Sequence, residues 1–129
     1  MPDVDGTKYL QDISTKKIYD IECNDPANAS RPVTRVGRFS FFEDMFDLAN
    51  DIILLAAQDN DIVIIDEIGK LEVEAKGFYR VAKKLIADPS FQKPDKHLVL
   101  VVRDSLYERM ISFFKISNHS CTTNIGTLL

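Results

Sequence analysis

The sequence has few of the residues that define thiol, metal or disulfide proteins. Its 129 residues include two cysteines, Cys23 and Cys121, which lie far apart and form no Cys-x-x-Cys motif. In a reducing compartment we expect free thiols, with a disulfide as the alternative. His97 and His119 add no standard ligand spacing around Cys121. We therefore expect no resident metal site built from histidine and cysteine.

Long apolar runs and clusters of positive charge are also missing. No stretch approaches the roughly 20 apolar residues that cross a bilayer, and residues 1–5 are acidic and polar, unlike a secretory signal. We expect a cytoplasmic protein without membrane contact. The 16 Lys and Arg residues are scattered and are outnumbered by 20 Asp and Glu, for a net charge of −4. This balance argues against general nucleic-acid binding, which requires a basic surface.

What remains is typical of one globular domain over residues 1–129. The chain is 45% hydrophobic and 28% charged, enough apolar material for a core. Alternating apolar and polar residues at 7–13 and 18–23 predict a β-hairpin. Residues 24–32 have the composition of a surface loop, and a short strand is expected within 33–39.

Helices are predicted by capping residues followed by helical spacing. Ser40 and Glu43 have the spacing of a capping box, and apolar residues then recur with helical periodicity as far as Ala56. Ser105 and Glu108 repeat that spacing and predict a third helix. The second helix is expected over residues 77–87. A weak strand is expected over residues 121–125.

Two short apolar runs predict the central strands. Residues 62–65 and 97–102 are rich in Ile, Val and Leu, which is typical of parallel strands covered on both faces. Strands that alternate with helices indicate βαβ winding with a right-handed crossover. The predicted class is therefore α/β, with 62–65 parallel to 97–102.

Two acids follow the first of these runs directly. Asp66 and Glu67 after an apolar strand form the pattern of a Walker B strand. Such a strand places a carboxylate at the edge where open α/β sheets bind ligands. Asp66 would hold Mg²⁺, usually through water, and Glu67 would act as catalytic general base toward the attacking water. The alternative is a buried strand that ends in two solvated acids.

Residues 66–72, Asp-Glu-Ile-Gly-Lys-Leu-Glu, resemble the Walker B region of the thermophile-type (cancer-related) nucleoside-triphosphatase family. Gly77-Phe78, the stretch 36–39 and the stretch 101–103 match further family features in the right order, so the resemblance spans about residues 8–114. It implies a three-layer P-loop NTPase core at about 33–115 with a β-hairpin insertion at about 7–23. It also implies Mg²⁺ with ATP or GTP as ligands.

Three cations are candidates for contact with the nucleotide. Arg38 either contacts phosphate or pairs with Glu43 or Asp44. Arg103 either faces the site or pairs with an acid. Lys70 lies near the metal position, but it comes from the wrong loop to replace a P-loop lysine.

The family's P-loop is missing from the sequence. The pattern Gly-x-x-x-x-Gly-Lys-Ser/Thr does not occur, and Gly69-Lys70 is followed by Leu71. The first strand, P-loop and first helix of the family need roughly 30 residues, and the chain is expected to begin after them. Three functions follow: an NTPase-like domain that is inactive or very weak alone, half of a split NTPase completed by a P-loop-bearing partner chain, or a non-catalytic interaction module.

The missing first strand also leaves an expected open edge. In folds of this type the first strand pairs with the strand equivalent to 97–102. An unpaired apolar edge invites pairing with another chain. We expect this edge to be covered by a second copy, which would make a homodimer, by a terminal segment, or by another partner.

Overall fold

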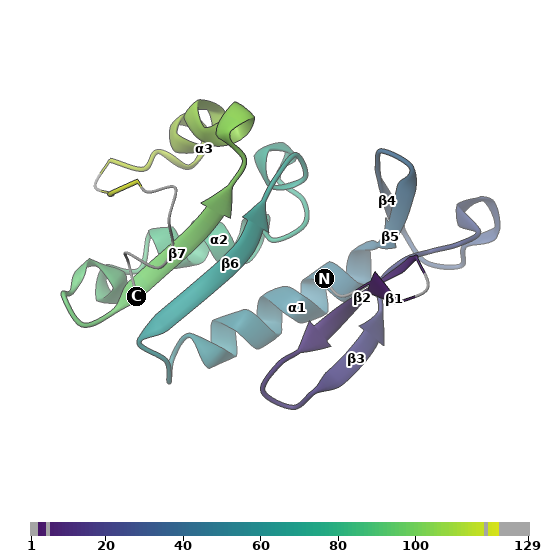
Figure 1. Cartoon of the computed structure of the whole chain (residues 1–129), viewed down its shortest axis with the longest axis horizontal. Helices are drawn as coiled ribbons and strands as arrows, with labels where there is room; N and C mark the ends of the chain where they lie inside the picture. The colour runs from purple at the N-terminus through teal and green to yellow at the C-terminus, as the bar shows by residue number, and fades with distance from the viewer. Residues whose placement is uncertain (1–2, 5, 118, 122–129) are drawn as a thin grey trace.

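The computed structural model describes residues 3–4, 6–117 and 119–121 and forms three separate β-sheets with three α-helices (Figure 1). The antiparallel strands are β1 (Asp3–Val4), β2 (Thr7–Asp12), β3 (Lys17–Asp20), β4 (Val33–Val36) and β5 (Phe39–Phe42). The remaining elements are α1 (Glu43–Ala56), β6 (Ile62–Ile68), α2 (Tyr79–Ile86), β7 (His97–Val102) and α3 (Tyr107–Phe114). The predicted α/β class is confirmed.

The N-terminal half is antiparallel. Strands β2 and β3 form the predicted hairpin, and β1 extends it. The strand expected within 33–39 is instead a second hairpin, because Gly37 has a φ of +59° and turns β4 back into β5. The segment after β3 joins the two hairpins, since the Cys23 N–H donates to the Ser40 carbonyl at 2.7 Å. The buried side chains here include Phe41 and Phe46.

Neither predicted capping box forms. Ser40 lies within β5, and α1 begins at Glu43, whose Oε1 accepts a hydrogen bond from the Thr34 hydroxyl at 2.6 Å. The backbone carbonyl of Ser40 and the side chain of Glu43 are thus engaged by tertiary partners. At the third helix, Ser105 lies in a 3₁₀ turn (Asp104–Leu106), and α3 begins after it without a side-chain cap.

Strands β6 and β7 are parallel, as predicted, with register from Ile62 opposite His97 to Asp66 opposite Val101. Alternation puts Val63 and Ile65 on one face, where they form the core with Leu98, Leu100 and Val102 and with side chains from α1, α2 and α3. The expectation that both faces are covered is wrong for β6. Ile62 is 46% exposed and Ile64 is 44% exposed, because all three helices contribute to the core on the opposite face.

Both cysteines are free thiols, with Cys23 buried and Cys121 exposed. The strand expected over 121–125 lies, apart from Cys121, outside the described residues. Within the described residues, no helix has the length and apolar character that a membrane span requires.

Candidate functional site

The end of β6 presents two neighbouring acids to solvent. Regular alternation would turn Glu67 toward the core, but the register with β7 shifts between Asp66 and Ile68. Glu67 is therefore the extra residue of a bulge, and Ile68 takes the buried position. As a result Asp66 and Glu67 are both exposed at the C-terminal end of a parallel strand.

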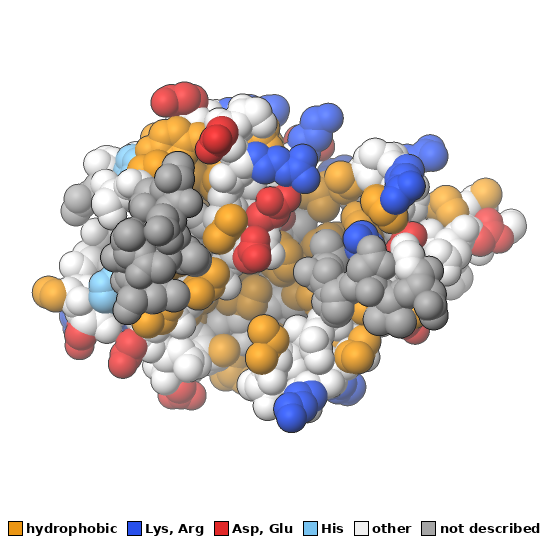
Figure 2. Space-filling view, viewed as in Figure 1, with side chains coloured by type: hydrophobic (Ala, Val, Ile, Leu, Met, Phe, Trp, Pro, Cys, Tyr) orange, Lys and Arg blue, Asp and Glu red, His pale blue; other side chains and the backbone are white. Residues whose placement is uncertain are grey.

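Arg103 meets Glu67 at this edge. Because β6 and β7 are parallel, their C-terminal ends lie side by side, and Arg103 directly follows β7. Its Nε lies 3.3 Å from Glu67 Oε1, with both side chains substantially exposed. Figure 2 shows acidic side chains beside a basic group near the arrowhead of β6. An exposed pair of this kind contributes about 0–1 kcal/mol to stability, so its main effect is to orient the two side chains.

The other two candidate cations lie elsewhere. Lys70 is exposed in the turn that directly follows β6. Arg38 lies in the turn of the β4–β5 hairpin, where its guanidinium is 4.8 Å from the centre of the Phe39 ring. Asp44, one of the acids considered as a partner for Arg38, is instead paired with Arg31, whose Nη2 lies 2.6 Å from Asp44 Oδ1. The structure thus brings Glu67 and Arg103 together and leaves Arg38 on a separate hairpin.

The donor set at the strand end fits a magnesium ion shared with phosphates. Mg²⁺ typically takes one or two carboxylates and completes its shell with water and phosphate oxygens. Asp66 offers an exposed carboxylate of this kind. The described residues contain no cluster of three acidic, histidine or cysteine side chains that could hold a metal ion without such help.

A third acid, Glu72, is buried just beyond the acidic strand. It is 4% exposed, in a 3₁₀ turn (Glu72–Glu74) after the acidic strand. Its Oε2 accepts from the Gly69 N–H at 2.9 Å, and its Oε1 accepts from the Phe78 N–H at 3.2 Å. Burial raises the pKa of this carboxyl, although the two hydrogen bonds act in the opposite direction. Glu72 closes the 66–72 stretch that carries the family resemblance, but its burial was not predicted from the sequence.

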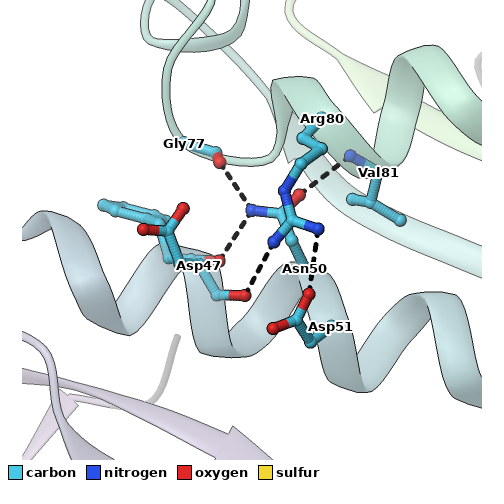
Figure 3. A network of polar contacts seen from close by, with 7 residues as sticks. Asp47, Asn50, Asp51, Gly77, Arg80 and Val81 are labelled. Atoms are coloured by element: carbon cyan, nitrogen blue, oxygen red, sulfur yellow. Dashed lines mark hydrogen bonds and ion pairs between the residues drawn. The ribbon is translucent and has the colours of Figure 1, made fainter.

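Asn50 was also missed, and it ties the region to α1. Its Nδ2 donates to the carbonyls of Phe46 at 2.6 Å and Gly77 at 2.9 Å, while its Oδ1 accepts from the Val81 N–H at 2.9 Å. Beside it Arg80 reaches back to α1 (Figure 3). The start of α2 is therefore fixed to α1 by a buried amide side chain.

These features define an α/β domain with an acidic pair at the end of a parallel strand. The family model described as NTPase matches residues 11–125. The chain therefore belongs to this NTPase family, which confirms the resemblance found in the sequence. No curated protein and no solved structure matches the chain.

Proposed function

We propose that this NTPase-family domain provides the acidic end of a Mg²⁺–nucleotide site and is inactive or very weak alone. Asp66 would bind the metal, and Glu67 would polarise the attacking water. Arg103, with Lys70, would contact phosphate oxygens, and Arg38 would do so if its hairpin approaches the nucleotide. The observation that carries the proposal is the exposed pair Asp66 and Glu67 at the end of β6, with Arg103 against Glu67.

The absence of a P-loop motif is the reason to expect low activity from this chain by itself. Phosphoryl transfer depends on positioning and on stabilising phosphate charge. A P-loop supplies both through consecutive backbone N–H groups and one lysine. The 129-residue sequence contains no such motif. The exposed acids and cations can attract a metal-bound triphosphate but do not enclose it.

The uncovered sheet favours a second candidate, half of a split NTPase. Ile62 and Ile64 share one face with Asp66 and are exposed. Among the described residues, β7 pairs with β6 alone, so its other edge has no strand partner. Parallel sheets are ordinarily covered on both faces. A strand and helix carrying a P-loop would cover the free edge and the apolar face next to Asp66.

Thermal unfolding with nucleotide tests the proposed site. A ligand that binds the folded chain stabilises it by about 0.4 kcal/mol when its concentration equals Kd. We expect millimolar Mg-ATP or Mg-GTP to raise the melting temperature slightly and Asp66→Asn to abolish the rise. Asp95→Asn, which changes an exposed acid before β7, should keep it. Equal responses of both variants would favour the non-catalytic interaction module.

Among the described residues, one edge of β7 has no strand partner, and this edge predicts association. We expect the purified chain to form a homodimer, because pairing satisfies backbone groups and covers apolar surface worth roughly 25 cal/mol per Å². Light scattering should give a mass above that of the monomer. Val101→Lys should lower that mass, whereas Gln92→Lys, an exposed change before β7, should not. A monomer at all concentrations would refute self-association through this edge.

A further inference from the structure

Glu72 joins the two ends of the loop that follows the acidic strand. One carboxylate oxygen accepts from Gly69, directly after β6, and the other accepts from Phe78, directly before α2. The side chain is buried, so each backbone N–H would lose its partner without gaining water if Glu72 moved. A single carboxylate therefore determines how the loop 69–78 closes.

The loop is shaped around this carboxylate. Gly77 has a φ of +60°, and a Cβ atom added there would lie 2.7 Å from Glu72 Oε1 and 3.1 Å from Leu71 Cβ. Real side chains do not tolerate the first of these distances. Glycine at position 77 thus leaves room for the carboxylate and also permits the left-handed backbone that brings Phe78 to it.

The C-terminal end of the loop 69–78, where α2 begins, is fixed to α1. Asn50 accepts from the Val81 N–H and donates to the Gly77 carbonyl, which fixes the start of α2 against α1. Phe78 lies between these two contacts and donates to Glu72. The carboxylate therefore connects an anchored helix to Gly69 at the free end of β6.

Gly69 is the residue that matters for the site, because it lies two residues after the bulged Glu67. We propose that Glu72 is a positioning residue for Glu67. By holding the Gly69 N–H, it fixes the end of the bulge and so directs the Glu67 carboxylate toward Arg103. The relevance of this positioning to catalysis rests on the proposed function, in which Glu67 is the general base.

The experiment compares Glu72→Gln with Glu74→Gln by NMR without nucleotide. Glutamine has one acceptor oxygen, so its amide nitrogen would face one of the two N–H donors. Amide exchange should rise by about tenfold or more in Glu72→Gln at whichever of Gly69 and Phe78 then faces the amide nitrogen. The Arg103 Nε–H resonance should move toward its position in Glu67→Gln. Glu74 is exposed in the same turn, and Glu74→Gln should leave all three signals unchanged.

Gly77→Ala provides a second test that preserves the charge. Its new methyl group should displace the Glu72 carboxylate and move the Arg103 signal in the same direction.

A pH titration of the wild-type chain gives a third test. Both N–H groups donate to the Glu72 carboxylate, so the amide chemical shifts of Gly69 and Phe78 should change with pH around one common midpoint. Faster exchange at Gly69 with an unmoved Arg103 signal would overturn the positioning role. Unchanged exchange, or separate midpoints, would overturn the shared carboxylate itself. Since no nucleotide is present, none of these results depends on the proposed function.

Discussion

The isolated chain should hydrolyse ATP and GTP at no measurable rate above the uncatalysed reaction. Its acids can bind a metal and orient water, but the sequence offers no P-loop to hold the β- and γ-phosphates. Ordinary enzymes turn over at about 1 s⁻¹ or faster. A phosphate-release assay with Mg²⁺ and each nucleotide measures the difference, which should be several orders of magnitude.

Glu67→Gln and Glu74→Gln form the matched pair for this assay. Both remove one exposed carboxylate, but only the first removes the candidate general base. A turnover near 1 s⁻¹ that Glu67→Gln abolishes and Glu74→Gln leaves intact would contradict the inactivity of the chain. If a P-loop-bearing partner chain restores hydrolysis and Glu67→Gln removes it again, the protein is half of a split enzyme.

Asn50→Asp should strongly destabilise the folded chain. The side chain is 1% exposed and donates to two carbonyls. The aspartate side chain has no N–H to donate. Its carboxylate would therefore face the carbonyl oxygens of Phe46 and Gly77 in the protein interior. We expect the free energy of unfolding to fall by about 3 kcal/mol or more at neutral pH. The loss should shrink in acid, where protonation removes the buried charge.

Asn60→Asp is the control, because the Asn60 side chain also donates to a backbone carbonyl but is exposed to solvent. Its Nδ2 donates to the Ala56 carbonyl four residues earlier at 2.6 Å, and the contact is exposed. The new charge lies near the C-terminal end of α1, so the expected loss is below about 1 kcal/mol. Urea unfolding of both variants measures the two values. Similar losses would show that the Asn50 network does not hold α2 to α1.

Apolar runs and helical apolar spacing predicted the central elements well, because strands and helices that pack on a core carry a local hydrophobic pattern. Residues 62–65 and 97–102 became parallel strands, and the apolar spacing up to Ala56 became α1. The helix starts were predicted poorly, since Ser40 and Glu43 found partners in other elements rather than in their own first turn. Such competition depends on tertiary contacts that local spacing does not encode.

The candidate site was predictable as chemistry but not as geometry. An acidic pair after an apolar strand indicated Asp66 and Glu67, and parallel pairing alone would bring Arg103 to the same edge. The bulge that exposes both acids depends on the register with β7. The burial of Glu72 and Asn50 was not predicted, because Glu and Asn side chains ordinarily lie at a surface, whereas both are buried in this fold and hold backbone groups.

Paramagnetic broadening by Mn²⁺, a substitute for Mg²⁺, tests the central claim most directly. Titration into the isotope-labelled chain with ATP present should first broaden the amide resonances of Asp66, Glu67 and Arg103, which lie together at the end of the parallel strands. Asp66→Asn should remove this selective broadening, and Asp95→Asn should preserve it. Broadening centred on other acids, or left intact by Asp66→Asn, would contradict a metal–nucleotide site at the end of β6.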